Sequence, residues 1–313
     1  MRKTTKMRFI CLTFSLIVTF CVASACAKKE VAPTQKTFTA AEDAVVALVD
    51  AVKANDSAQI LNILGPDGKK ILSSGDDVAD QQARELFLIA YAEKAELSQE
   101  GDRTILSIGA EEWPMPIPLV KDGNNWKFDT AAGLQEVLYR RIGGNELSII
   151  QLCRAYLDAQ KEYASKGHDG KPKGLYASRY LSTAGKHDGL YWHSEDPNDK
   201  SPFGELAAEA AAEGYSKSDS KPQPFRGYYF RILTSRGAAA PGGELNYLVN
   251  GEMKKGFAMI AFPAEYKNSG VMTFIVDDLG TTYQKDLGTD TAKLAAAITT
   301  FNPDSSWEKV ESE

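Results

Sequence analysis

The sequence predicts an α+β protein in which helices and a small antiparallel sheet come first, and a long helix packed on a mostly antiparallel sheet follows. Three observations predict this order. Apolar residues recur at helical spacing through 39–91, and the pattern changes to strand-like alternation from residue 103. After a second helical stretch at 145–164, five β-type segments follow one another between 227 and 287.

The N-terminal helices are marked by their ends. Thr39 and Glu42 have the spacing of a capping box, which predicts a helix start at this point. A short helix is predicted over 57–64 and ends at Gly65. A third helix is predicted to begin near Asp77. Its expected buried face comprises Ala83, Leu86, Phe87, Ala90 and Tyr91.

A small antiparallel sheet follows these helices. Residues 103–109 alternate between apolar and polar side chains like a strand, and 113–120 are predicted to be an extended edge segment interrupted by prolines. A turn at 121–125 then leads into a further extended segment at 126–130. This order is similar to the cone fold of nuclear transport factor 2, an analogy that concerns shape and implies no activity.

A domain boundary is predicted at Gly143 and Gly144, after a helix over 134–141. It separates an N-terminal α+β domain, 38–143, from a C-terminal α+β domain, 144–313. The helix at 145–164 is expected to pack on the second sheet through Ile150, Cys153 and Leu157. Cys153 is therefore predicted to be a buried, inert thiol.

The rest of the C-terminal domain begins with a polar connection at 166–201 and a helix from Ser201 to Gly214. The predicted strands are 227–233, 244–249, 256–262, 271–276 and 281–287, and a last helix covers 291–301. One long helix on such a sheet resembles the globular head of a pilin. Filaments are not expected, because charged side chains line the outer face of 145–164, and a monomer or small oligomer is predicted. These are Arg154, Asp158, Lys161 and Glu162.

The first 25 residues have the features of an export signal. Residues 1–8 carry four basic side chains and no acid, 9–22 are apolar, and small residues precede Cys26. The apolar run is shorter than the ~20 residues that span a bilayer. The stretch before Cys26 also resembles a lipobox. We therefore predict a signal peptide (1–25), lipidation of Cys26 and a tether (26–37), which places the protein on the periplasmic side of the outer membrane, or in the soluble periplasm if Cys26 is unmodified.

The mature chain is acidic. Loss of four basic residues from 36 leaves 32 Lys and Arg against 42 Asp and Glu, a formal charge of −10. Nucleic acid is not an expected partner, since phosphate binding needs clustered basic side chains. Apart from the lipid, no contact with a membrane is predicted, and a disulfide within the chain is excluded if Cys26 is lipidated.

Several phrases in the sequence are too specific to reflect composition. They include WPMPIPLVKDGNNWKFDTAAG, RRIGGNELSIIQLCRAYLDAQKEYA, PFRGYYFRILTSRGAAAPGG and FNPDSSW. Over residues 38–307 the chain closely resembles the bacterial family of proteins of unknown function numbered 2950. The resemblance implies an exported protein and assigns no activity, cofactor or catalytic residue.

Two of the three histidines lie in HDGLYWHSED, residues 187–196. His187 and His193 are six residues apart in a loop, and His168 belongs to another segment, so no metal-ligand spacing is present. We expect solvated loops, with no metal and no cofactor. The sequence also lacks the GxSxG, HExxH, GxxxxGK[ST] and GxGxxG motifs.

Two functions remain open. The first is a non-enzymatic binding module for an envelope protein or a small ligand, with Tyr191 and Trp192 as an exposed aromatic anchor and with Arg226 and Tyr228 on one strand face. The second is a periplasmic hydrolase that uses carboxylates at strand ends. The candidate acids are Glu265, Asp277, Asp278 and Asp286.

Overall fold

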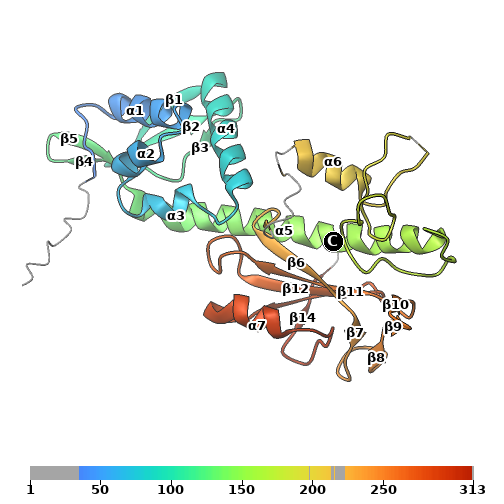
Figure 1. Ribbon diagram of the computed structural model, residues 1–313. Coiled ribbons are helices and arrows are strands. Elements are labelled where there is room, and N and C mark those ends of the chain that lie inside the picture. The colour runs from blue at the N-terminus through green and yellow to red at the C-terminus, as the bar shows by residue number, and fades with distance from the viewer. Residues whose placement is uncertain (1–34, 197, 213–214, 216–222, 312–313) are drawn as a thin grey trace, which may run out of the picture. The chain divides into compact units, whose positions relative to one another are not determined.

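The computed structural model describes residues 35–196, 198–212, 215 and 223–311 (Figure 1). The signal segment, Cys26 and most of the tether lie outside these ranges. The first helices are α1 (Ala41–Lys53), α2 (Ser57–Leu64), α3 (Gly68–Leu72) and α4 (Asp77–Glu93). The antiparallel sheet that follows has the order β1-β2-β4-β5, with β3 paired to β2. Its strands are β1 (Ala95–Glu100), β2 (Arg103–Ile108), β3 (Trp113–Pro114), β4 (Leu119–Asp122) and β5 (Asn125–Phe128).

The first core forms where α1 and α2 cover one face of this sheet. Leu106 and Ile108 alternate inward along β2, and Leu119 and Phe128 join them from β4 and β5. The prediction for α4 is wrong in part, because of the five residues expected in its buried face only Phe87, Ala90 and Tyr91 pack against the core.

Ala83 and Leu86 of α4 face away from this core, and Leu86 is 66% exposed. The apolar periodicity of this helix therefore predicts a wider buried face than its neighbours cover.

The predicted capping box is absent. The helix begins at Ala41, its N-cap residue is Ala40, and no side chain caps it. The hydroxyl of Thr39 donates to the carboxylate of Asp43 at 2.8 Å instead. The predicted helix boundaries at Gly65 and Asp77 are confirmed: Gly65 is the C-cap residue of α2, and α4 begins at Asp77, where the Asp76 side chain accepts from the amide of Ala79.

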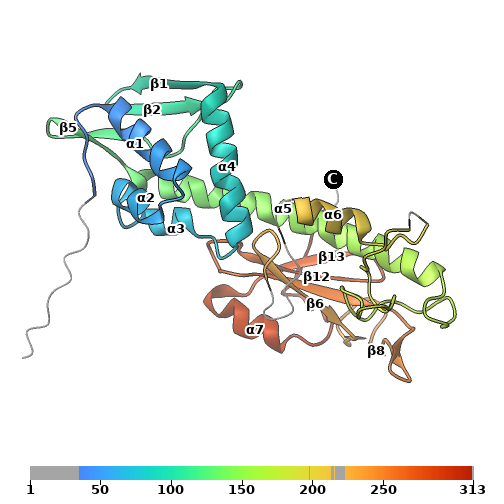
Figure 2. The same ribbon diagram turned by 45° about the horizontal axis from the view of Figure 1, so that its top comes forward.

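The helix α5 (Thr130–Ser165) runs without interruption through Gly143 and Gly144, so the predicted break between two helices is wrong (Figures 1 and 2). Neither glycine has a positive φ, and a Cβ at either position would meet no atom within 4 Å, so the helix can pass through both. Val137 packs against the first core, whereas Ile149 and later residues belong to a second one. One helix thus contributes to two cores, and the division into two domains stays a prediction.

The C-terminal half contains α6 (Gly204–Ala212) and a five-stranded antiparallel sheet of order β14-β13-β12-β11-β6. Its strands are β6 (Tyr228–Leu233), β11 (Ala258–Pro263), β12 (Met272–Asp277), β13 (Thr282–Asp286) and β14 (Glu308–Lys309). The short pairs β7 (Ser235–Arg236) with β8 (Leu245–Asn246), and β9 (Leu248–Val249) with β10 (Glu252–Met253), lie between β6 and β11 in the chain. The predicted α+β class is confirmed.

Both faces of the five-stranded sheet are buried, because successive side chains along each strand point to opposite faces and both sets are apolar. Met259 and Phe274 join the core that α5 covers, whereas Ile260 and Ile275 join a third core on the other face. That face is covered by α7 (Thr291–Ala297), which follows the short 3-10 helix η1 (Gly288–Asp290) and is shorter than predicted.

The predicted contact of the long helix is confirmed: Cys153 and Leu157 are buried in the core shared with the sheet, and Ile150 packs against it. Arg154, Asp158, Lys161 and Glu162 are exposed, as expected for the outer face of α5. The helix predicted from Ser201 begins at Gly204, and its predicted end at Gly214 lies outside the described residues. Within the described ranges, no helix is both long and apolar enough to cross a bilayer.

Candidate functional site

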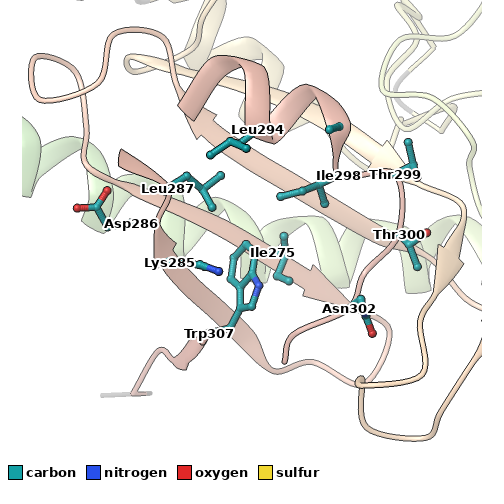
Figure 3. Close-up of a pocket in the computed structure, with 11 residues that line it drawn as sticks. Ile275, Lys285, Asp286, Leu287, Leu294, Ile298, Thr299, Thr300, Asn302 and Trp307 are labelled. Carbon is teal, nitrogen blue, oxygen red and sulfur yellow. The ribbon is translucent and has the colours of Figure 1, made fainter. Parts of the chain in front are cut away.

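A groove of about 490 Å³ lies on the sheet face that carries α7. Figure 3 shows its arrangement: Leu294 and Ile298 come from α7 and its end, and the indole of Trp307 lies across from them beside Ile275. Leu287 completes this apolar middle. The two ends of the groove are polar, with Lys285 and Asp286 at one end and Thr299, Thr300 and Asn302 at the other.

The groove exists because the chain turns away from the helix after Ala297. The guanidinium group of Arg231 on β6 donates to the carbonyls of Ala295, Ala296 and Ile298, at 2.7, 3.0 and 2.5 Å. These bonds satisfy carbonyls that a helix leaves free at its C-terminus. The segment after Ala297 is thereby held at the sheet, and it pairs with β7 at Phe301 before it reaches Trp307.

The wall of the groove opposite α7 is the ring of Trp307, and Lys285 holds this part of the chain in place. Its ammonium group donates to the hydroxyl of Ser306 at 2.6 Å and lies 5.9 Å from the centre of the Trp307 ring. Trp307 is half-buried, and Leu294 is 44% exposed. An indole face opposite aliphatic side chains, with hydrogen-bonding groups at both ends, has the composition of a small-molecule site.

A second, smaller cavity of about 220 Å³ lies where α5 ends, and it brings two of the three histidines together. The ring of His168 stacks on Tyr163 at 4.1 Å between centroids, and the ring of His187 lies 4.4 Å from Trp192. Both histidines are half-buried in loops, so the expectation of largely solvated side chains is wrong for them. His193 is exposed, as expected.

His187 joins three loop segments. Its Nδ1 lies 3.7 Å from Oδ1 of Asp169, and its Nε2 lies 3.3 Å from Oδ2 of Asp199. The indole N–H of Trp192 donates to the same Asp199 carboxylate at 3.1 Å. Both ring nitrogens therefore face carboxylates of other loop segments, and His187 holds these segments together as a clamp.

His168 has a different environment. Its Nε2 donates to the carbonyl of Tyr163 at 3.0 Å, which leaves Nδ1 with a lone pair in the neutral ring. Burial lowers the pKa of His168, and the nearby His187 adds to this effect. Among the side chains that the structure describes, no three His, Cys, Asp or Glu residues gather so that they could hold a metal ion.

The aromatic pair predicted as an exposed anchor is not one. Trp192 is 9% exposed and belongs to the core under α5. Tyr191 is half-buried, and its backbone exchanges hydrogen bonds with the loop at Tyr180 and Ser182. The sequence places both aromatic residues in a polar loop, but it does not show that this loop folds over the core of the second sheet.

Arg226 and Tyr228 do not form a shared binding face. Tyr228 is fully buried, and its hydroxyl donates to the carbonyl of Met272 at 3.0 Å. Arg226 precedes β6 with a positive φ of 49°, so the strand alternation that would place the two side chains together has not yet begun. Its guanidinium lies 3.4 Å from the hydroxyl of Ser148.

Two of the four candidate acids meet in the sheet. Asp277 and Asp278 lie at the end of β12, and Arg236 reaches both, with Nε 3.6 Å from Oδ2 of Asp277 and Nη2 3.6 Å from Oδ1 of Asp278. Burial raises the pKa of both carboxyls, and the charge of Asp278 helps to raise that of Asp277 to about 6. This buried group resembles a structural ion cluster, because Arg236 also donates to the carbonyl of Pro241 at 2.7 Å.

The other two acids are engaged elsewhere. Glu265 accepts from the side-chain amide of Asn268 at 2.7 Å in a turn. Asp286 accepts from the hydroxyl of Tyr266 and from the amide of Gly288 at the rim of the groove. The predicted convergence is therefore limited to Asp277 and Asp278.

The predicted burial of Cys153 is confirmed, and burial raises the pKa of its thiol to about 12. The residues that sequence reasoning missed are those of the groove, above all Leu294, Ile298 and Trp307. A signal for them exists in the phrase FNPDSSW, which follows an apolar helix with only a few residues between. The pattern does not reveal that the helix ends at Ala297 and leaves Ile298 facing Trp307.

No curated protein matches the chain, and no solved structure matches it. One family model, described as a protein of unknown function (DUF2950), matches residues 35–310. The chain is a member of this family.

Proposed function

We propose that this protein is a non-enzymatic binding module of the bacterial cell envelope whose ligand occupies the groove between α7 and Trp307. The observation that carries the proposal is the composition of the groove: aliphatic side chains face an indole ring, and both ends are polar. A small amphipathic ligand fits this arrangement, because its apolar body would leave water while its ends keep hydrogen bonds.

The proposed location rests on the features of the first 26 residues. A basic start, a short apolar run and small residues before Cys26 support export and lipidation of this cysteine. A lipid on Cys26 would hold the folded part at the membrane surface through the tether. No partner other than the envelope ligand is required by this proposal.

A hydrolase that uses acids of the C-terminal half is the second candidate. It is favoured by the pKa of Asp277, which burial raises to about 6 and thus toward the range of a general acid or base. The position of this carboxyl opposes it, since Asp277 is 1% exposed and faces Arg236. The carboxylate of Asp286 at the groove has no second acid beside it in the lining.

Titration with the apolar dye 1-N-phenylnaphthylamine tests the groove. We expect Leu294→Ser and Trp307→Ala to weaken dye binding by at least about tenfold, because each removes one apolar wall. The matched controls are Leu279→Ser and Trp113→Ala, whose side chains are 53% and 61% exposed outside the groove.

Equal dye binding by all four variants would show that the groove is not a binding site. Turnover of ester or glycoside substrates that disappears in Asp277→Asn would favour the hydrolase instead.

A further inference from the structure

The ring of His187 lies between two carboxylates that come from different segments of the loop region after α5. Its Nδ1 faces Asp169 at 3.7 Å, and its Nε2 faces Asp199 at 3.3 Å. A neutral imidazole has one N–H and one lone pair, so it donates to one of these carboxylates and turns a lone pair toward the other. The protonated ring has two N–H donors and attracts both.

Each of the two carboxylates is oriented through its second oxygen. Oδ2 of Asp169 accepts from the backbone N–H of His187 at 2.9 Å, and Oδ1 of Asp199 accepts from the indole N–H of Trp192 at 3.1 Å. The first oxygen of each acid is left to face the ring. Hydrogen bonds from Ser194 and Trp192 and the charge of His187 lower the pKa of Asp199, so this carboxylate stays ionised over the range in which histidine titrates.

The other charged groups near the ring are engaged elsewhere or more distant. Lys166 pairs with Glu162 at 3.1 Å at the end of α5. Asp188, the next residue after His187, lies 3.7 Å from Arg179 and accepts from the amide of Thr183. Two exposed cations remain beside the ring or in the lining of the cavity, and these are Lys186 and Lys200.

Two further titratable groups contact this region and stay neutral at mildly alkaline pH. The ring of His168 lies 6.4 Å from that of His187 between centroids, and burial lowers the pKa of His168 from 6.5. The hydroxyl of Tyr163 donates to the carbonyl of His187 at 2.7 Å, and burial raises the pKa of this tyrosine to about 12. Neither group supplies a charge that would change between about pH 6.5 and pH 8.

The contacts of His187 reach the core under α5. Leu190 and Trp192, which follow His187 in the chain, are buried in this core. Because the carboxylate of Asp199 binds both the indole N–H of Trp192 and the ring of His187, a weaker hold on this acid acts directly on Trp192. The attraction to Asp169 and Asp199 is full when the ring is charged, and it decreases as pH rises through the range in which histidine titrates.

We propose that His187 is a pH-dependent clamp. Its protonated ring holds the segments at Asp169 and Asp199 together, and loss of the proton loosens the packing of these loops around Trp192. The clamp goes beyond the proposed ligand groove and shares no lining residue with it, so each can fail without the other.

Hydrogen exchange of the Trp192 indole N–H, measured by NMR on the folded chain, tests the clamp. Division by the exchange rate of a free indole at the same pH gives the protection of this N–H and removes the intrinsic effect of pH. We expect protection to fall roughly three- to tenfold between pH 6 and pH 8, because the ion pairs are partly exposed and individually weak.

Two substitutions should remove this dependence on pH. His187→Gln lacks the titrating ring, and Asp169→Asn lacks one of the two charges. Asparagine tolerates the left-handed φ of 49° at position 169 as aspartate does, so the backbone is expected to stay in place. His193→Gln is the matched control, since His193 is an exposed histidine of the same loop, and it should behave like the original protein.

Unchanged indole signals of Trp113, Trp126 and Trp307 show that each variant is folded. The proposal is wrong if protection in the original protein is equal at pH 6 and pH 8, or if His187→Gln keeps the dependence. A dependence that disappears in His168→Gln and persists in Asp169→Asn would assign the effect to His168 and contradict the clamp.

Discussion

At the scale of the residue, Asp277 couples the stability of the C-terminal sheet to pH. Burial raises its pKa from the ordinary 3.8 to about 6. Between these two values the folded protein binds more protons at this carboxyl than the unfolded chain does. The contribution of Asp277 to the free energy of unfolding therefore falls as pH rises from about 4 to about 6, and it is constant above that range.

We predict that Asp277→Asn removes this part of the pH dependence. Relative to the original protein, the variant should gain roughly 2–3 kcal/mol between pH 4 and pH 7, since one pKa unit corresponds to about 1.4 kcal/mol. Urea unfolding at both pH values measures the difference. The matched control is Asp286→Asn, at an exposed carboxyl for which no such gain is expected. An identical pH dependence in Asp277→Asn and the original protein would contradict the burial argument.

His168 offers a second test at this scale. Because burial lowers its pKa, we predict a titration midpoint below 6.5 for His168 in NMR spectra of the folded protein. The unfolded chain then binds the proton more readily, so acidification below pH 6.5 destabilises the folded state through this residue. Assignment uses His168→Gln, which should remove one titrating signal. A midpoint at 6.5 or above would contradict the argument that burial governs the titration of His168.

At the scale of the element, the glycines of α5 differ in whether the fold requires a residue without a side chain. A methyl group on Gly143 or Gly144 meets no atom within 4 Å, whereas one on Gly133 would lie 2.5 Å from the carbonyl oxygen of Pro116. Alanine costs less backbone entropy than glycine within a helix. We predict that Gly143→Ala and Gly144→Ala each raise the free energy of unfolding by about 0.5–1 kcal/mol.

Gly133→Ala provides the contrast in the same helix and should lower the free energy of unfolding by about 1–3 kcal/mol, because backbone atoms would have to move. Denaturant unfolding of the three variants measures these effects. Destabilisation by Gly143→Ala would indicate that α5 bends or breaks at this point after all.

The same helix shows how far periodicity carries a prediction. The face of 145–164 was predictable because burial follows the 3.6-residue repeat, and Cys153 and Leu157 lie where that repeat places them. The continuity through Gly143 and Gly144 was not, because glycine propensity favours a break and only packing at both ends overrides it.

The turn at Asn250 and Gly251 was also predictable, since both residues have the positive φ that this dipeptide favours. The groove was beyond prediction, as it depends on contacts between residues far apart in sequence, such as Arg231 with the end of α7. For the same reason the sequence placed Trp192 and Tyr228 on a surface, although tertiary packing buries both.

At the scale of the whole molecule, the predicted localisation depends on Cys26. We predict that the mature protein begins at a lipidated Cys26 and partitions into detergent, because two or more acyl chains anchor a protein stably. Cys26→Ala should move it to the soluble fraction or stop processing. Mass spectrometry of the mature N-terminus checks this, and an unmodified Cys26 at that position would contradict lipidation while leaving export intact.

The central claim, that a ligand binds between α7 and Trp307, can be tested through the indole N–H signals of the four tryptophans. These are Trp113, Trp126, Trp192 and Trp307, and Trp307→Phe identifies the signal of the last. The measurement is an NMR spectrum of the folded chain before and after addition of a small-molecule extract of the cell envelope. We predict that the Trp307 signal shifts while the other three stay in place; a shift confined to Trp192, or no shift at all, would contradict the account.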